Sequence, residues 1–334
     1  MKKLFVLALA VVVTGLAFAG GDKEGGASGK PVVIQIGYEN QPGEPIDLGI
    51  REWARLVEER SKGTMKIEVF PSSQLGSKNE IIDQMLAGMA VITLADGAFY
   101  ADRGVPDLGI TFAPYLFATW DEAWKLTKSD WWKGQMKQMD DKGLHVLTAN
   151  WIYGERHTIA KKPIRTVADF RGLKIRVPNN LIQVKGMEVM GATPTPMALG
   201  EVYTSLQQGV IDGMENPLTT IYGSKAHEVA KYITLDGHVK NFTTWVCGTI
   251  FFNKLTPEQQ KILQETGDAA GIFNNNLQNQ LTEKTVADLK AEGAEIITVN
   301  VAAFQNQAKA FYSLPEITSK WTPGLFDTVT KAMK

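Results

Sequence analysis

The chain has 334 residues, with 35 Lys and Arg against 36 Asp and Glu, which gives a formal net charge of -1. A hydrophobic content of 44% excludes an intrinsically disordered chain, and the lack of a basic excess argues against general nucleic-acid binding. The single cysteine, Cys247, excludes an intramolecular disulfide; its apolar neighbourhood predicts a buried strand residue, with a catalytic nucleophile as the alternative.

An export signal is predicted at the amino terminus. Lys2 and Lys3 precede an almost wholly apolar run over 4–16, and Ala17-Phe18-Ala19 supplies the small residues of a cleavage site. We therefore expect residues 1–19 to be a cleaved signal peptide, residues 20–29 to be a flexible leader, and the mature protein to be periplasmic. An uncleaved amino-terminal membrane anchor is the alternative.

Strand and helix patterns alternate along the mature chain. β-branched runs and alternation of apolar with polar residues predict strands over 32–36, 65–69, 91–94, 144–148 and 173–177. Helical spacing of apolar residues and capping signals predict helices over 46–57, over 81–86 behind the capping box Ser77-Glu80, after Thr119, and over 181–190 and 199–208. This alternation favours an α/β fold with mostly parallel sheets flanked by helices.

The second half of the chain predicts one long helix. Thr256-Pro257 is a helix start with proline in the first turn. If Gly267 and Gly271 are tolerated, the helix extends to Gly293 and is long enough to contact two lobes. Two lobes are expected because about 300 structured residues exceed one ordinary core.

Signatures of catalysis are missing from the sequence. It contains no GxSxG, HExxH or CxxC motif, and the glycines of 25–30 lack the spacing of a phosphate-binding loop. The four histidines lack ligand spacing; they are His145, His157, His227 and His238. We therefore expect a protein that is not an enzyme and has no cofactor and no metal site.

Several sequence blocks occur in an order that resembles a known family. They are Phe70-Pro71-Ser72-Ser73-Gln74-Leu75-Gly76, Trp151-Ile152-Tyr153-Gly154-Glu155-Arg156, Gly172-Leu173-Lys174-Ile175-Arg176-Val177-Pro178-Asn179, Glu201-Val202-Tyr203-Thr204-Ser205-Leu206-Gln207-Gln208-Gly209 and Asp212-Gly213-Met214-Glu215-Asn216-Pro217. The order resembles the solute-binding proteins of tripartite ATP-independent periplasmic (TRAP) transporters, of the DctP type. The resemblance covers nearly the whole mature chain and implies a hinged, two-lobed periplasmic binding protein fold.

The resemblance also implies an organisation and a function. Lobe I is expected over 30–153 plus 242–281, and lobe II over 154–241 plus 282–334, with the long helix spanning both. The implied protein is a monomeric extracytoplasmic receptor that binds a small carboxylate-bearing organic acid between the lobes and delivers it to TRAP membrane subunits. An exported α/β enzyme acting on an organic acid remains an alternative, as does a receptor for an ABC importer or a sensor kinase.

Three residues are the main candidates for binding the ligand carboxylate. By resemblance, Arg176 matches the arginine that pairs with the carboxylate, Arg156 matches a second donor in sialic-acid-binding members, and Asn216 matches an asparagine that bonds the same group. Arginine suits this role because its planar fork of donors meets both carboxylate oxygens. The alternatives are a surface cation for each arginine and a helix cap for Asn216.

Four polar residues are weaker candidates. Glu39 and Asp96 fall where sialic-acid-binding members place polar contacts from the opposite lobe; solvated loop residues are the alternative. Lys78 is a candidate for a distal carboxylate or a helix-surface lysine, and Glu215 adjoins Asn216. Because Glu39 replaces an asparagine and Lys78 an acid, the resemblance does not specify sialic acid. Dicarboxylates, uronic or aldonic acids and keto acids stay open.

Three apolar residues complete the candidate site. Leu199 occupies a position where an aromatic residue lines the pocket in the family. Trp151 and Trp245 are candidates for an apolar wall, although large aromatic residues more often lie in a core.

Overall fold

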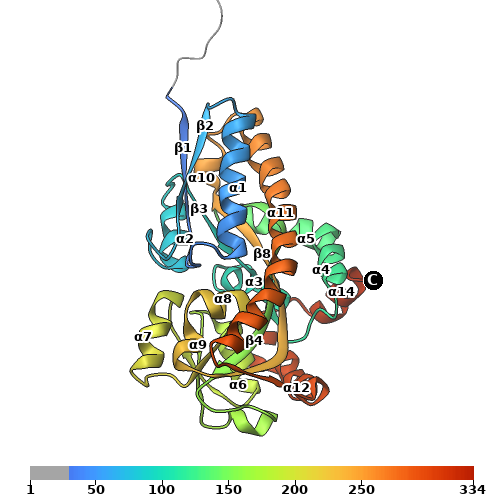
Figure 1. Ribbon diagram of the computed structural model, residues 1–334. Helices are drawn as coiled ribbons and strands as arrows, with labels where there is room; N and C mark the ends of the chain where they lie inside the picture. Colours follow the sequence, from blue (N-terminus) through green and yellow to red (C-terminus); the bar gives the residue numbers. More distant parts are fainter. Residues whose placement is uncertain (1–29) are drawn as a thin grey trace, which may run out of the picture. The chain divides into compact units, whose positions relative to one another are not determined.

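The computed structural model describes residues 30–334, so the predicted signal peptide and leader lie outside the described residues. Within 30–334, nine strands form one sheet (Figure 1). They are β1 (Val32–Gly37), β2 (Met65–Phe70), β3 (Val91–Ala95), β4 (Leu144–Ala160), β5 (Lys174–Val177), β6 (Thr193–Pro196), β7 (Gly213–Pro217), β8 (Tyr232–Gly248) and β9 (Glu295–Thr298). Their order is β2-β1-β3-β8-β4-β7-β5-β6, and β9 pairs with β8.

Parallel pairing predominates outside the centre of the sheet. β1 is parallel to β2 and β3, β5 is parallel to β6 and β7, and β9 is parallel to β8. The long strands β4 and β8 are antiparallel to each other and to β7 and β3, respectively. The expected α/β class with mostly parallel pairing is therefore confirmed, although the strands join in one continuous sheet.

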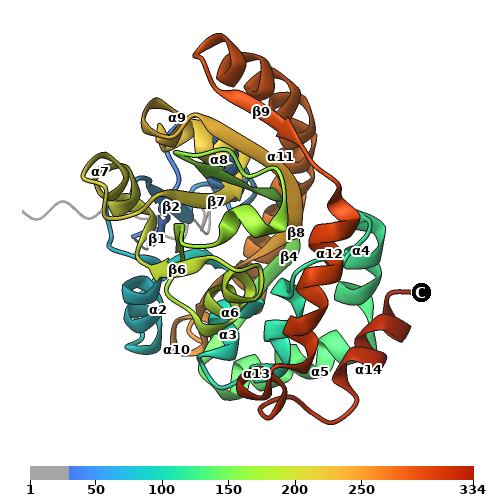
Figure 2. The ribbon, with the colours of Figure 1, turned by 90° about the horizontal axis from the view of Figure 1, so that it is seen from below.

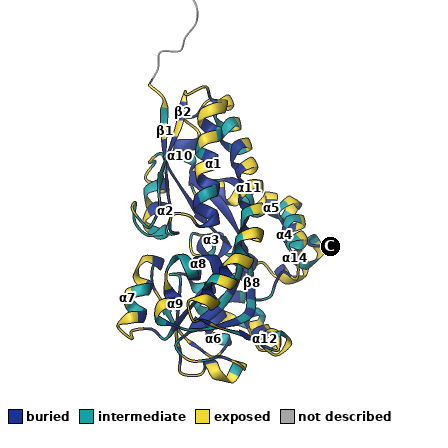
Figure 3. Ribbon diagram, in the orientation of Figure 1, coloured by how far each residue is buried: buried dark blue, intermediate teal, exposed yellow. Residues whose placement is uncertain are grey.

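Helices flank this sheet, and Figure 2 shows the arrangement from below. They are α1 (Pro45–Arg60), α2 (Lys78–Leu86), α3 (Gly97–Ala101), α4 (Trp120–Lys128), α5 (Asp130–Asp141), α6 (Leu181–Val189), α7 (Val202–Gln207), α8 (Leu218–Gly223), α9 (Ala226–Val229), α10 (Thr249–Phe252), α11 (Pro257–Ala291), α12 (Val301–Ala308), α13 (Pro315–Thr318) and α14 (Leu325–Ala332). Short 3₁₀ helices lie at η1 (Pro106–Phe112), η2 (Val167–Phe170), η3 (Leu199–Glu201) and η4 (Lys309–Ser313). Strands β3, β7 and most of β8 are buried, whereas β1 and β2 are partly exposed and the outer faces of α1 and α11 are exposed (Figure 3). No helix within 30–334 has the length and apolar character needed to cross a membrane.

The helix starts follow the signals in the sequence. Ser77 and Glu80 form the expected capping box of α2, and Thr119 and Glu122 form another at α4. In each box the cap hydroxyl accepts a backbone N–H, and the glutamate accepts the N–H of the cap residue. The predicted helix over 199–208 is confirmed only in part, because its first turn is the 3₁₀ helix η3.

Strand β4 is longer than the sequence pattern predicts. The block Trp151–Arg156 does not close a strand, because β4 continues to Ala160 beside β8 with several shifts of register. Near these shifts, α11 supplies side-chain hydrogen bonds to the strand backbone. Asn275 accepts from Ile152 N at 2.7 Å, and Gln278 donates to Tyr153 O at 2.9 Å. Side-chain amides thus form hydrogen bonds with backbone groups where the strand pairing is irregular. The alternation of apolar and polar residues in the sequence cannot indicate such bonds.

Helix α11 tolerates its internal glycines because aromatic rings occupy the space. Trp53 and Trp151 lie tilted at 6.1 Å between ring centroids, and each packs edge-on against Trp245. The indole N–H of Trp151 donates to Gly267 O at 3.0 Å. At Gly267 helix α11 therefore packs closely against the tryptophan rings, and the helix continues through this residue.

The carboxyl-terminal segment packs where the sequence does not place it. Apolar residues of η4, α13 and α14 share a hydrophobic cluster with residues of α4 and α5, and α14 contacts both helices, as Figures 1 and 2 show. The expected boundaries assign α4 and α5 to lobe I but residues 282–334 to lobe II. The segment therefore contacts helices that the boundaries place in the other lobe.

Replacing Gly267 with alanine tests the close approach. A Cβ at Gly267 lies 2.8 Å from Trp53 Cζ2, so we expect Gly267→Ala to lower the unfolding free energy by about 1–3 kcal/mol. The matched control is Gly134 in α5, where a Cβ meets nothing within 4 Å. Gly134→Ala should stabilise by up to about 1 kcal/mol through helix propensity. Urea unfolding measures both, and equal gains would contradict the packing argument.

Candidate functional site

A narrow polar cavity lies beside the carboxyl ends of β1, β3 and β5, against β4, β7 and β8. Ligands of α/β proteins commonly bind at such strand ends. Its lining includes seven of the ten residues predicted from the sequence, namely Glu39, Lys78, Asp96, Arg156, Arg176, Leu199 and Asn216. Residues far apart in the chain are therefore brought together in one site.

Six further lining residues were not predicted as site residues. They are Leu94, Phe99, Tyr153, Pro178, Gln183 and Asn241. Tyr153 and Pro178 belong to blocks that carry the family resemblance, so a wider use of those blocks would have found them. Asn241 lies on β8 and enters the site through the pairing of β8 with β4, which no local pattern reveals.

Arg176 is a buried guanidinium without a carboxylate partner. It is 2% exposed, and its Nε and Nη2 both donate to Met197 O, at 2.9 and 2.7 Å. Among residues 30–334, no carboxylate oxygen lies within 4.0 Å of its nitrogens. Burial lowers the pKa of Arg176, and the negative charge of Glu39 only partly offsets this effect. The surroundings therefore leave its charge uncompensated, which favours a bound anion.

Asn216 places a second buried polar side chain in the cavity. Its side chain is 2% exposed, and its Oδ1 has no hydrogen-bond partner among the described residues. Helix α8, which follows directly, has no side-chain cap. The helix-cap alternative for Asn216 is therefore not what the structure shows.

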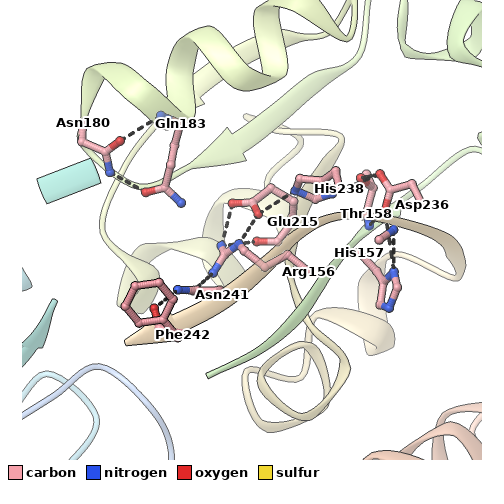
Figure 4. A network of polar contacts seen from close by, with 11 residues as sticks. Arg156, His157, Thr158, Asn180, Gln183, Glu215, Asp236, His238, Asn241 and Phe242 are labelled. Carbon is pink, nitrogen blue, oxygen red and sulfur yellow. Dashed lines mark hydrogen bonds and ion pairs between the residues drawn. The ribbon is translucent and has the colours of Figure 1, made fainter. Parts of the chain in front are cut away.

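Arg156 is neutralised within the protein (Figure 4). Its Nε and Nη2 form a bidentate pair with the carboxylate of Glu215, in which the Nη2–Oε1 distance is 2.7 Å. Its Nη1 donates to Asn241 Oδ1 at 3.3 Å. Burial alone would lower the pKa of Arg156, but the charge and hydrogen bonds of Glu215, together with the charges of nearby groups, outweigh burial and raise it. Glu215 itself lines a small neighbouring cavity rather than this one.

Two more buried charges extend this pair. His238 Nε2 lies 3.1 Å from Glu215 Oε2, and its Nδ1 lies 3.2 Å from Asp236 Oδ2. Burial opposes the charge on His238, but the charges and hydrogen bonds of Asp236 and Glu215 together outweigh burial and raise the pKa of His238 to about 9. Despite burial, Arg156 and His238 lower the pKa of Glu215 to about 2. The four groups form an ion network with two charges of each sign.

Three other charged groups share the cavity with Arg176. Lys78 Nζ lies 4.4 Å from the centroid of the Phe99 ring, and burial lowers the pKa of Lys78 against the charges of Asp96 and Glu39. Asp96 caps α3 by accepting from Ala98 N at 3.0 Å, and burial raises the pKa of Asp96 against the charge of Lys78. Lys78 is thus directed into the cavity rather than over a helix surface.

Hydrogen bonds join the two expected lobes near the cavity. Glu39 Oε1 accepts from Leu199 N at 3.1 Å, and Asp102 Oδ2 accepts from Leu181 N at 3.1 Å. In each case the acceptor carboxylate belongs to the expected lobe I and the donor N–H to the expected lobe II. The structure therefore has the expected lobes in contact around the cavity.

Trp151 and Trp245 do not line the cavity. Both are fully buried in the cluster with Trp53 between α1, α11 and the sheet. Leu94, Phe99 and Leu199 form the apolar part of the lining instead. The described residues include no group of three or more His, Cys, Asp or Glu side chains placed to hold a metal ion.

Comparison with known proteins identifies the family. Residues 36–316 match the family model of the bacterial extracellular solute-binding proteins, family 7 (DctP). The chain belongs to this family. Among solved structures, a TRAP periplasmic solute-binding protein of Ochrobacterium anthropi with bound L-fuconate is 40% identical, with a TM-score of 0.88, covering 91% of this chain and 100% of that one.

Other relatives agree with this assignment. A TRAP solute-binding protein of Actinobacillus succinogenes with bound L-galactonate is 38% identical, with a TM-score of 0.86 and coverage of 90% and 99%. The 2,3-diketo-L-gulonate-binding periplasmic protein of Escherichia coli is 30% identical over 79% of this chain and 80% of its own length. The chain is therefore a TRAP-type solute-binding receptor; such receptors are periplasmic and work with membrane subunits.

The charge of His238 predicts a pH dependence of stability. Because its folded-state pKa is about 9, above the usual 6.5, the protonated ring stabilises the fold fully below pH 6.5. This stability is lost as the pH rises through about 9. His238→Gln should lower the unfolding free energy near pH 6 by about 3–5 kcal/mol, because two buried carboxylates lose their partner.

Thermal unfolding followed by circular dichroism between pH 6 and 10 measures this effect. His145→Gln is the control, since His145 pairs with the exposed Asp140. The control should keep the wild-type decrease in Tm above pH 6.5, whereas His238→Gln should flatten it. Equal slopes in the two variants would contradict a charged His238.

Proposed function

We propose that the protein binds an open-chain sugar acid through the cavity and delivers it to TRAP membrane subunits. The observation that supports this most directly is the buried Arg176 with no carboxylate partner within 4.0 Å among residues 30–334. A ligand carboxylate would compensate this charge, with the amide of Asn216 as a second donor. The relatives with bound L-fuconate and L-galactonate support an aldonate as the ligand class.

We propose that the ligand is held by closure of the two expected lobes. The bonds from Leu199 to Glu39 and from Leu181 to Asp102 would form on closing and add to the contacts of the ligand. A ligand shifts such an equilibrium only by its difference in affinity for the open and closed states. Arg176 and Asn216 lie in the expected lobe II, whereas Lys78 and Asp96 lie in lobe I. A ligand that touches both sets binds the closed state more tightly.

Three further properties belong to this proposal. The mature protein is exported after cleavage of residues 1–19, acts as a monomer, and returns its ligand unchanged. The last point separates a receptor from an exported enzyme that uses Glu39, Asp96 or a histidine as a proton carrier. Prolonged incubation with L-galactonate followed by NMR should recover only the starting acid, and a new product would refute the receptor assignment.

Removing Arg176 tests the carboxylate site. Arg176→Ala should weaken binding of L-galactonate by about 2–5 kcal/mol, because the ligand anion would be desolvated and underpaired. This corresponds to a loss of affinity of about thirtyfold or more. The Tm without ligand should change little, since the substitution breaks no ion pair. Isothermal titration calorimetry and thermal shift measure the two quantities.

The control for this variant lies directly before the same sequence block. Arg171 is exposed, so Arg171→Ala should retain wild-type affinity. A large fall in the ligand-free Tm of Arg176→Ala, with affinity retained, would show that Arg176 is structural and would refute the proposed carboxylate site.

A further inference from the structure

A second polar group lies in the cavity with Arg176 and Asn216. It consists of Glu39 after β1, Lys78 in the first turn of α2, and Asp96 at the cap of α3, and we call these three residues the distal group. Arg176 and Asn216 come instead from β5 and β7. The cavity therefore presents different polar chemistry from two separate parts of the sheet.

The distal group has unused hydrogen-bonding capacity. Lys78 Nζ makes no hydrogen bond or ion pair with any residue of 30–334 and lies over the Phe99 ring. Glu39 uses Oε1 for Leu199 N, and Asp96 uses Oδ1 for Ala98 N. Within the described chain, the other oxygen of each carboxylate has no donor. One donor centre and two acceptor atoms are therefore available to a ligand.

The charges in the cavity leave room for one ligand carboxylate. Arg156 is paired with Glu215, so Arg176 and Lys78 are the cations in the lining that form no ion pair among residues 30–334. Lys78 already faces the charges of both Asp96 and Glu39, which gives the distal group a net charge of -1. A second carboxylate placed there would meet two like charges and one shared cation, an arrangement that costs affinity.

Hydroxyl groups match the distal group better than a carboxylate does. A hydroxyl donates one hydrogen bond and accepts others, whereas an ionised carboxylate only accepts. Neighbouring hydroxyls on one carbon chain can accept from the Lys78 ammonium and donate to the free oxygens of Glu39 and Asp96. A carboxylate could use Lys78 alone and would leave both acidic residues without donors.

We propose that the distal group makes this receptor selective for polyhydroxylated monocarboxylates over dicarboxylates, with Lys78 and Asp96 as specificity-determining residues. This inference rests on the proposed function, because it assumes that Arg176 binds the ligand carboxylate. It adds to that function a discrimination between a hydroxyl and a second carboxylate at the end of the ligand away from Arg176.

Two acids that differ at one carbon test the discrimination. L-Galactonate and galactarate share the hydroxylated chain, but the last carbon is a primary alcohol in the former and a carboxylate in the latter. Calorimetry on the wild-type protein should show at least about tenfold tighter binding of L-galactonate. Asp96→Asn keeps a side chain that caps helices well and removes one negative charge. This variant should reduce the preference for L-galactonate about tenfold, mainly by admitting galactarate.

Lys78→Met provides a second, independent variant. It keeps an unbranched apolar stem and removes the ammonium, so L-galactonate should bind about tenfold more weakly or worse. Lys137→Met on α5 is the control, because Lys137 is exposed and outside the cavity; its affinity should match the wild type. The inference is overturned if galactarate binds wild type as tightly as L-galactonate and Lys78→Met weakens galactarate more, since Lys78 would then receive a second carboxylate.

Arg176→Ala in the same series separates the two proposals. If Arg176→Ala loses both acids while Asp96→Asn and Lys78→Met keep the wild-type preference, the distal-group inference fails and the proposed function stands. If Arg176→Ala binds both acids like the wild type, or if the wild type binds neither, both proposals fail. If Arg176→Ala loses binding and the distal variants shift the preference as expected, both are supported.

Discussion

A buried, uncompensated guanidinium is the constraint on which the binding site depends. Arg176 is removed from water, and its two bonds to the protein end on one carbonyl oxygen, that of Met197. A carbonyl fixes the orientation of the fork but does not cancel its charge. The short strand β5 and the turn after it thus hold a buried cation that no carboxylate of the described chain pairs with, and the proposed ligand carboxylate would compensate it.

The contrast between the two arginines explains how the site divides its tasks. Arg156 is as deeply buried as Arg176, but Glu215 already satisfies it, and His238 with Asp236 extends the network. Such a network orients its members by mutual bonds and leaves little charge for a ligand. Arg156 is therefore better suited to shape and electrostatic support of the cavity, whereas under the proposed function Arg176 would bind the ligand carboxylate.

The sequence predicts the elements and much of the site, but not the long strands. Local signals such as the Ser77-Glu80 box or the Thr256-Pro257 start depend on neighbouring residues, and the structure confirms them. The Arg176 block could be recognised because its residues are contiguous. The continuation of β4 past Trp151 depends on β8 and on amides of α11, which are contacts between distant segments.

Aromatic residues show the same limit of prediction from the sequence. Trp151 and Trp245 are next to polar candidates in the sequence, yet in the strands they face the core around Trp53. Which face of a strand a residue occupies depends on register, and the shifts of β4 against β8 make this register hard to derive from the sequence. By contrast, Asp96 reaches the cavity because capping α3 holds it at the strand end.

The amide contacts between α11 and β4 have a consequence for motion. Where the ladder of β4 slips, the chain is tethered by Asn275 and Gln278 instead of by a second strand. Long side chains can follow a tilting strand by rotating about their own bonds, whereas a regular ladder must shear as a unit. The backbone of this segment is therefore shielded from water, while the side chains that bond it can still rotate. Strand β4 can bend here without leaving peptide groups unbonded.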